Sequence, residues 1–317
     1  MEKITLGKTG ILVSRLAFGT LTMSPFQRNL SAEEGASVIL AALERGVSFI
    51  DTAQMYGSYP QVKAALNSWK GNPPVISTKS TAETGDSMKQ AIEEACQALN
   101  LDRIDIFLMH AVKDQEALEK RKPALGELLE AKRAGRIKAI GLSTHSVQLT
   151  RIAAEIPEID IIHPIINMAG YGNLDGSRDE MIDNVSLAAR NGKGIYAMKP
   201  LGGGNLKNEA SKALKWIISQ KNVHSVCTGM TSVDEVIMNC AIFEGKSVEE
   251  EFEKKIAKLE RKLFVNTMLC SACNKCVDIC QSGALEIVNG KLNIEHSRCL
   301  LCGYCAPECP RFALRII

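Results

Sequence analysis

The chain reads CSACNKCVDIC at residues 270–280 and CLLCGYCAPEC at residues 299–309. Each stretch has the spacing C-x2-C-x2-C-x3-C, and Pro310 follows the second. In proteins that bind two clusters, this spacing lets the fourth cysteine of each run bind the other run's iron–sulfur cluster. The two stretches therefore predict a small C-terminal domain folded around two [4Fe-4S] clusters.

The same spacing predicts how the eight cysteines divide between the clusters. One cluster is expected on Cys270, Cys273, Cys276 and Cys309, and the other on Cys299, Cys302, Cys305 and Cys280. Two structural zinc sites are the alternative, because thiolates also bind tetrahedral zinc. Three cysteines at two-residue intervals surround a cuboidal cluster more naturally than a single ion, which favours iron and sulfide. Gln281 stands where a proline often follows the fourth cysteine.

Composition narrows the class of protein and its partners. With 317 residues and 45% apolar residues, the chain can form one large domain and a small second one. The formal charge is only +2 and no basic stripe is present, so we expect no nucleic-acid partner. We also expect no membrane span, and the concentration of cysteines at 270–309 indicates metal binding in a reducing compartment, the cytoplasm. The pattern leaves the oligomeric state open.

The rest of the chain alternates short apolar runs with helical patterns. The runs expected to be strands are 16–18, 49–51, 75–78, 104–109, 137–143, 159–166, 194–198 and 225–227. The segments expected to be helices are 32–45, 87–99, 117–134, 147–155, 179–191 and 209–220. Eight such strands predict a closed (β/α)8 barrel. An open doubly wound sheet is the alternative, but the turn after the first run, Phe18-Gly19-Thr20, lacks its glycine-rich signature.

Two further segments set the expected domain limits. Residues 3–13 predict a hairpin before the first barrel strand. Residues 249–262 are rich in charge, and Phe252, Ile256, Leu259 and Leu263 form an apolar stripe, which predicts a connecting helix. We therefore expect a barrel at 1–245, a charged linker helix at 246–265 and a ferredoxin-like α+β domain at 266–317.

Four polar residues follow successive strands of the expected barrel. Asp51 and Tyr56 follow the second strand, Lys79 the third and His110 the fourth. The carboxyl ends of barrel strands share one mouth, where active sites lie, so these side chains should meet. Each alone has an ordinary structural explanation as a cap, a rim residue, a surface charge or a core histidine. Together they indicate catalysis.

Their chemistry suits proton transfer to a carbonyl oxygen. A nearby ammonium favours the phenolate of a tyrosine by roughly 1–3 pKa units, and Asp51 can hold Lys79 in place. We therefore expect Tyr56 to serve as general acid and His110 to stabilise charge on the substrate oxygen.

The chain resembles the aldo-keto reductase family over roughly residues 1–240. The matching pieces are Asp51-Thr52-Ala53, Tyr56-Gly57, Ile76-Ser77-Thr78-Lys79, Leu108-Met109-His110, Gly141-Leu142-Ser143 and Lys199-Pro200-Leu201-Gly202. The resemblance implies the four catalytic roles above, a small carbonyl or alcohol substrate and an extended NAD(P)H across the barrel mouth. The nucleotide contacts that it implies are Gly19, Thr20, Asp51, Ser143, Thr144, His163, Met198, Lys199, Pro200, Leu201, Gly202, Gly203, Gly204, Gly229, Met230, Thr231, Ser232, Glu235 and Asn239.

The chain departs from the family pattern at several of these positions. Thr144 stands where an asparagine is common, His163 where a glutamine is, and Met198 where an aromatic side chain is. Glu235 takes the place of an arginine that binds a 2′-phosphate, which favours NADH over NADPH. Alternatively, Glu235 is an acidic residue of a helix's first turn.

The two expected domains handle electrons differently, because hydride transfer moves a pair and each cluster exchanges one. A flavin or a radical-tolerant substrate would have to connect them. We expect an NAD(P)-dependent carbonyl or alcohol oxidoreductase whose clusters serve an external one-electron carrier. One alternative is an electron-transfer or regulatory protein whose barrel is a docking module, and another is clusters that are structural or oxygen-sensing. We also expect residues 266–317 to cover part of the barrel mouth.

Overall fold

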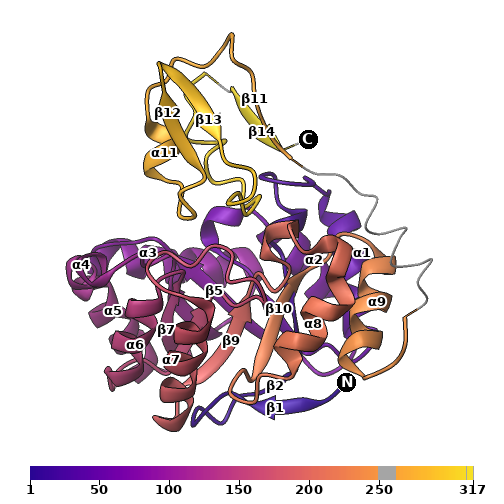
Figure 1. The fold of residues 1–317 in the computed structure, drawn as a ribbon. Coiled ribbons are helices and arrows are strands. Elements are labelled where there is room, and N and C mark those ends of the chain that lie inside the picture. The colour runs from indigo at the N-terminus through magenta and orange to yellow at the C-terminus, as the bar shows by residue number, and fades with distance from the viewer. Residues whose placement is uncertain (249–261, 312, 317) are drawn as a thin grey trace.

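The computed structural model describes residues 1–248, 262–311 and 313–316. The chain opens with a hairpin of β1 (Lys3–Thr5) and β2 (Leu12–Ser14), which pair antiparallel with Lys3 opposite Ser14. Leu6, Ile11 and Val13 from this hairpin are buried against side chains inside the barrel. The expected hairpin is therefore confirmed, and it closes the end of the barrel where the strands begin (Figure 1).

Eight parallel strands close into the barrel that the sequence predicts, and the last strand pairs with the first at Val226 and Leu16. The strands are almost fully buried, as expected for parallel strands covered by helices. In chain order they are β3 (Leu16–Gly19), β4 (Phe49–Asp51), β5 (Val75–Ser80), β6 (Ile104–Met109), β7 (Ile137–Thr144), β8 (Ile161–Pro164), β9 (Gly194–Met198) and β10 (Ser225–Gly229).

Helices surround the barrel and bury their apolar faces on the strands. They are α1 (Ala32–Glu44), α2 (Tyr59–Ser68), α3 (Gly85–Leu99), α4 (Gln115–Lys120), α5 (Lys122–Arg133), α6 (Val147–Glu155), α7 (Arg178–Arg190), α8 (Ala210–Ile218) and α9 (Val233–Phe243). The sequence reading missed α2 and α9. It also joined α4 and α5, which are separate because Pro123 lacks a backbone N–H and fits only the first turn of α5.

The C-terminal domain is small and has its own core. Strand β11 (Leu263–Val265) pairs antiparallel with β14 (Leu314–Ile316), and β12 (Leu285–Val288) pairs antiparallel with β13 (Lys291–Ile294). The short helix α11 (Lys275–Asp278) lies beside them. These elements form an α+β ferredoxin-like domain, as predicted, above the end of the barrel where the strands finish (Figure 1). The charged linker helix expected at 246–265 falls mostly outside the described residues, and the last three residues of that span form the strand β11 instead.

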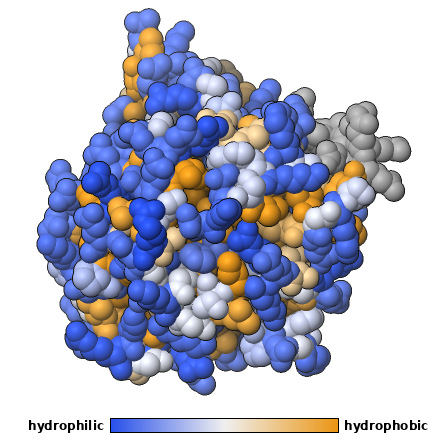
Figure 2. Space-filling model, turned by 60° about the horizontal axis from the view of Figure 1, so that its bottom comes forward, coloured by the Kyte–Doolittle hydropathy of each residue, from blue (hydrophilic) through white to orange (hydrophobic). Residues whose placement is uncertain are grey.

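Polar and apolar residues are distributed as in a protein with an internal core. Figure 2 shows mostly hydrophilic residues on the side that it presents, with smaller apolar groups among them. None of the helices in the described part of the chain has the length and apolar character that crossing a membrane requires.

Candidate active site

The four side chains expected to meet at the barrel mouth do so. Asp51 ends β4, Lys79 lies near the end of β5, and His110 directly follows β6. Tyr56 ends the short 3-10 helix η2 (Gln54–Tyr56), which begins three residues after β4. All four are at most 6% exposed. The parallel strands bring residues that are far apart in sequence into one buried cluster.

Lys79 and Asp51 form a buried ion pair at the floor of this cluster. Lys79 Nζ donates to both carboxylate oxygens of Asp51, at 2.8 and 2.7 Å, and to the carbonyl of Thr52 at 2.7 Å. The hydroxyl of Tyr196 donates to Asp51 Oδ1 at 2.9 Å. Lys79 Nζ lies 5.1 Å from the centre of the Tyr56 ring. The pair is therefore fixed on several sides and lies next to the phenol.

The protonation of Tyr56 differs from the expectation. Burial raises the pKa of Tyr56 well above that of a free tyrosine, and Tyr304 and Asp51 add to the rise. The expected lowering of the Tyr56 pKa is therefore wrong in direction, because burial disfavours the charged phenolate and outweighs the neighbouring ammonium, which is paired with Asp51. Tyr56 thus stays protonated at neutral pH and holds a proton to give.

His110 is held in its neutral form. Burial lowers its pKa well below the usual histidine value, and the charges of Lys79 and Lys199 lower it further. Its ring centre lies 5.4 Å from that of Tyr56, edge to face. Its Nδ1 atom has no hydrogen-bond partner among the described residues. A neutral imidazole whose Nε2 carries the proton can donate one hydrogen bond to an oxygen in the site.

The structure adds a residue that sequence reasoning missed. The hydroxyl of Tyr304, from the C-terminal domain, donates to the hydroxyl of Tyr56 at 3.4 Å and lies 3.3 Å from His110 Nε2. Tyr304 is 4% exposed. Its place inside a cysteine run, between Cys302 and Cys305, gave no sign of a contact with the barrel.

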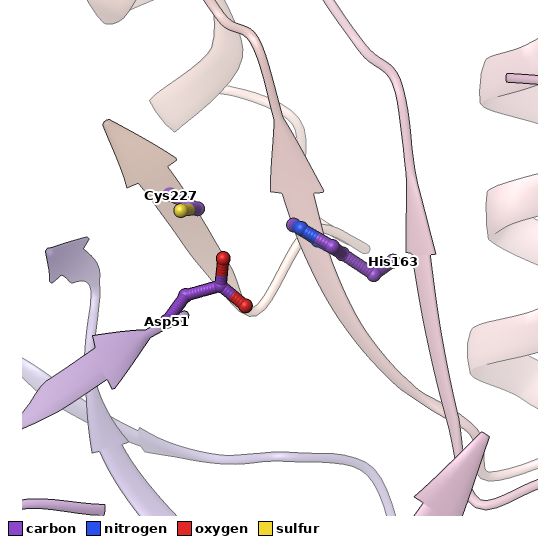
Figure 3. A group of neighbouring side chains, drawn as sticks. All are labelled: Asp51, His163 and Cys227. Atoms are coloured by element: carbon purple, nitrogen blue, oxygen red, sulfur yellow. The ribbon is translucent and has the colours of Figure 1, made fainter. Parts of the chain in front are cut away.

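Asp51 lies close to His163 and Cys227, and polar atoms of the three side chains are within 4.8 Å of one another (Figure 3). His163 donates from Nδ1 to the carbonyl of Tyr196 at 2.6 Å and stacks on the ring of Tyr196 at 3.8 Å. A metal ion here would face the Lys79 ammonium, which already lies 2.7 Å from Asp51. The charge therefore disfavours a cation, and all three side chains instead line the cavity at the barrel mouth.

A cavity of about 420 Å³ extends from the tetrad across the barrel mouth. Many residues expected to contact the nucleotide line it: Gly19, Asp51, Ser143, His163, Met198, Lys199, Pro200, Leu201, Gly203, Gly204, Gly229, Thr231, Glu235 and Asn239. The remaining ones are not among its lining residues: Thr20, Thr144, Gly202, Met230 and Ser232. Thr20 instead bonds to Ser58, and Thr144 accepts from the backbone of Ser146.

Several polar atoms in this cavity have no partner within the protein. Thr22 Oγ1, Thr228 Oγ1 and Asn239 Oδ1 are buried without a hydrogen bond among the described residues, and all three residues line the cavity. Buried polar atoms normally have partners, so these atoms fit a polar ligand that completes their bonds. Gly203 and Gly204 have positive φ values of 70° and 107°, which allow backbone amides to face such a ligand.

Glu235 makes the local contacts of a residue in the first turn of a helix. Its carboxylate accepts from the backbone N–H and the hydroxyl of Thr231, at 2.5 and 3.0 Å. It also lines the cavity. The contacts with Thr231 fit an acidic residue in the first turn of a helix, and the position at the cavity wall fits a residue that contacts a nucleotide.

The C-terminal domain forms one wall of the cavity, as expected. Gln281, Leu300, Leu301 and Tyr304 line it together with barrel residues. Asn205, next to the glycine loop, donates to the carbonyl of Cys299 at 2.9 Å. A Cβ added at Gly203 would lie 2.1 Å from the carbonyl oxygen of Leu300, so only glycine permits this approach.

The cysteines surround two small cavities in the C-terminal domain. Cys270, Cys273, Cys276 and Cys309 line one, and Cys280, Cys299, Cys302 and Cys305 line the other. These are the two groups that the spacing predicts. The first group contains exposed Cys273 and buried Cys276, whereas Cys299 and Cys305 of the second group are both buried and share their cavity with Tyr304.

Residues 15–213 match the model of the aldo/keto reductase family, and residues 269–313 match that of the 4Fe-4S dicluster domain. A probable aldo-keto reductase 1 of Glycine max is 29% identical, over 64% of this chain and 60% of its own length. L-galactose dehydrogenase of Arabidopsis thaliana is 22% identical, over 76% of this chain and 88% of its own length.

Solved structures agree with the fold. A Pseudomonas aeruginosa structure assigned to the aldo-keto reductases has a TM-score of 0.66 at 25% identity, covering 77% of this chain and 95% of its own. An aldo-keto reductase of Bacillus halodurans has a TM-score of 0.64 at 19% identity, covering 82% and 97%.

Proposed function

The chain belongs to the aldo-keto reductase family, and on this basis we propose that its barrel interconverts a small carbonyl compound and the corresponding alcohol with NAD(P)H. The observation that carries the proposal is the buried meeting of Tyr56, His110 and the Lys79–Asp51 pair. The Arabidopsis thaliana relative is named as a dehydrogenase, so oxidation of the alcohol is proposed beside reduction of the carbonyl. We place the protein in the cytoplasm, where thiolates stay reduced.

In the proposed reduction, a carbonyl compound, NAD(P)H and one proton give the corresponding alcohol and NAD(P)⁺, and the nucleotide supplies the hydride to the carbonyl carbon. Tyr56 gives its proton to the carbonyl oxygen, since burial keeps the phenol protonated. Neutral His110 donates a hydrogen bond from Nε2 to the same oxygen and stabilises its developing charge. Asp51 fixes the Lys79 ammonium beside the phenol, where it stabilises the phenolate left after proton transfer.

The unpartnered polar atoms of Thr22, Thr228 and Asn239 support a dinucleotide along the 420 Å³ cavity, with Gly203 and Gly204 near its phosphates. We propose NADH as the preferred form, because a carboxylate at Glu235 repels a 2′-phosphate and accepts bonds from a free ribose. The hydrogen bonds from Thr231 hold this carboxylate in place at the cavity wall.

For the dicluster domain we propose the two ligand sets that line its cavities, Cys270, Cys273, Cys276 and Cys309, and Cys299, Cys302, Cys305 and Cys280. The set that contains exposed Cys273 faces solvent, where an external one-electron carrier can approach. The set next to Tyr304 faces the barrel. Electrons would therefore enter or leave at Cys273 and reach the barrel on the Cys302 side.

A second candidate function is electron transfer or regulation, with the barrel as a docking module. The position of Tyr304 favours it, because its hydroxyl lies beside both Tyr56 and His110, where a substrate oxygen would bind. Under this function a partner reduces the clusters and no carbonyl is reduced.

One experiment separates the two candidates. Anaerobically purified full-length protein is assayed for iron, sulfide and flavin, and NADH is then added with and without a panel of small aldehydes. NADH oxidation that requires the aldehyde and is lost in Tyr56→Phe supports the reductase. The electron-transfer function would instead be supported if a one-electron donor protein reduces the clusters and no aldehyde in the panel causes NADH to be oxidised.

A further inference from the structure

The side chain of Tyr304 fills the space in front of the catalytic residues. Its ring lies nearly parallel to that of Tyr56, with an interplanar angle of 27° and ring centres 6.5 Å apart. The rings of Phe26 and His110 meet it edge to face, with centres at 6.2 and 6.0 Å. Tyr304 is therefore held by one stacked and two edge-to-face aromatic neighbours, which is how a site can hold a ring-shaped ligand.

The hydroxyl of Tyr304 also occupies the position of a substrate oxygen. An oxygen that accepts hydrogen bonds from both Tyr56 and His110 has to lie between the Tyr56 hydroxyl and His110 Nε2. Tyr304 Oη lies 3.4 and 3.3 Å from these atoms. Two oxygen atoms cannot share this place, so a substrate and Tyr304 exclude one another.

The space that Tyr304 takes defines the shape of the molecule that replaces it. Apolar side chains of Leu21, Phe26 and Met55 belong to the same cluster as the ring, and the ammonium of Lys199 lies 6.0 Å from the ring centre. The Tyr56 hydroxyl and His110 Nε2 meet the oxygen at the tip. In a phenol the oxygen is bonded directly to a six-membered ring. A cyclic molecule with its oxygen on the ring matches this arrangement better than an aldehyde, whose carbonyl carbon separates the oxygen from any ring that it carries.

We propose, resting on the carbonyl–alcohol function above, that Tyr304 is an internal stand-in for the substrate and that this site binds a benzoquinone-type ring or its hydroquinone when Tyr304 leaves. In the reaction the quinone takes up two electrons and two protons, and its two ring C=O groups become C–OH. With NAD(P)H as donor, the hydride carries both electrons and one hydrogen to the ring, and Tyr56 gives the one proton to the ring oxygen; the added C–H hydrogen is then exchanged for a proton on the second oxygen as the ring becomes aromatic. With a one-electron carrier protein as donor, the two electrons arrive singly, Tyr56 gives one proton to the ring oxygen and solvent gives the other.

A quinone can also accept electrons from the donors proposed for both domains of this chain. Most simple carbonyls accept a hydride but not single electrons, whereas a quinone accepts either. Cys302 packs in the same cluster of side chains as Tyr56 and Tyr304, so the cavity that it lines borders the reaction site. A ligand in place of Tyr304 would lie next to both kinds of electron donor.

The position of Tyr304 depends on the cysteine loop that carries it. Cys302 and Cys305 flank it and line one cavity, and Asn205 holds the start of the loop through the carbonyl of Cys299. A Cβ added at Gly303 would lie 2.7 Å from the carbonyl oxygen of Phe26, so this glycine lets the loop press against the barrel. A movement of the loop that carries Tyr304 would therefore change how tightly a ligand binds in place of its side chain.

The test measures binding, without turnover, on full-length protein purified anaerobically with matched iron and sulfide content. The probes are hydroquinone, 4-methylphenol (the tyrosine side chain itself) and cyclohexanone. Tyr304→Ala should bind the two aromatic probes at least about tenfold more tightly than the wild type, because it no longer has to expel its own ligand. Met268→Ala, which trims a side chain of the same domain that is 90% exposed and outside the cavity, should leave the affinities unchanged.

A gain for cyclohexanone equal to that for the aromatic probes would overturn the aromatic class, and no gain for any probe would overturn the stand-in role. If Tyr304→Ala does not load its clusters, wild-type protein with 3-fluorotyrosine decides the matter. Its Tyr304 resonance, assigned with Tyr304→Phe, should shift as hydroquinone is added, and an unchanged resonance at saturation rejects the proposal. Tight binding of hydroquinone by a protein that reduces no carbonyl compound with NAD(P)H would refute the proposed function but leave this inference intact.

Discussion

The hydroxyl of Tyr304 lies 3.4 Å from the hydroxyl of Tyr56, although 248 residues separate the two in sequence. Both rings are buried, and they share one apolar cluster with Ala53. The contact joins the iron–sulfur domain to the reacting groups of the barrel. Changes in the cysteine loop therefore act directly on the residues proposed to carry out the chemistry.

Tyr56→Phe should lower kcat for carbonyl reduction by about 100- to 10,000-fold, because it removes the proton donor and little else. Nucleotide affinity should remain within a few-fold of the wild type. The measurement is steady-state NAD(P)H oxidation together with nucleotide titration. Tyr59→Phe is the matched control, since Tyr59 is also buried but bonds to Thr78 outside the cavity. A Tyr56→Phe enzyme with wild-type kcat would remove Tyr56 from the chemistry.

Asp51→Asn should destabilise the folded protein by about 3–5 kcal/mol, because it leaves the Lys79 ammonium buried without its counter-charge. Denaturant unfolding followed by circular dichroism measures the change. Glu130→Gln, which breaks the exposed pair with Arg133, should cost under about 1 kcal/mol. Equal losses in the two variants would mean that the buried pair contributes no more than a surface pair.

The barrel and the position of the tetrad could be predicted because they depend on local patterns. Each strand is a short apolar run, and the closed barrel then brings Asp51, Lys79 and His110 to one mouth. The helix α2 was missed because its sequence, YPQVKAALNS, has little apolar periodicity and a proline in its first turn. Its first-turn proline reads equally well as a turn signal.

Tyr304 could not be predicted because its role depends on how two domains are placed against each other. Nothing in Cys302-Gly303-Tyr304-Cys305 indicates which barrel residue it would meet. The predicted direction of the Tyr56 pKa shift was wrong for a related reason. The sequence indicates that Lys79 is a charged neighbour. It does not show how deeply Tyr56 is buried, or that Asp51 pairs with Lys79 and offsets its charge.

The stability of the protein should fall in mild acid because of His163. Burial, only partly offset by Asp51, lowers the pKa of His163 to about 4 from a usual 6.5. The unfolded chain therefore binds this proton first, so the contribution is full above pH 6.5 and is lost as pH falls toward 4. The loss amounts to about 3 kcal/mol.

Unfolding free energies between pH 7.5 and 5 measure this effect, in a range chosen above the folded-state pKa. His163→Gln should show a shallower decline than the wild type. His296→Gln, which changes an exposed side chain, serves as the control. Parallel pH profiles for wild type and His163→Gln would assign the acid sensitivity to other groups.

Cys309→Ser should remove about half of the bound iron, because Cys309 completes the cavity of Cys270, Cys273 and Cys276. Iron and sulfide analysis and the electron paramagnetic resonance spectrum of the reduced protein measure the loss. Cys280→Ser should remove the other half and change a different signal. Cys96→Ser, in the barrel helix α3, should keep the full iron content. Loss of the same signal in Cys309→Ser and Cys280→Ser would disprove the crossed ligand sets.

Glu235→Gln should raise the affinity for NADPH by about tenfold, or ~1.4 kcal/mol, while NADH binding weakens. The substitution removes a negative charge from the cavity wall and keeps the shape of the side chain. Asp234→Asn is the control, because Asp234 shares the first turn of α9 but is not among the residues that line the cavity. Titration of both dinucleotides against protein fluorescence gives the affinities. Asp234 and Glu235 both lie in the first turn of α9 and interact similarly with the helix dipole. An equal change in NADPH affinity in the two variants would therefore mean that Glu235 only stabilises the helix. Tighter binding of NADPH than NADH by the wild type would reject the proposed preference.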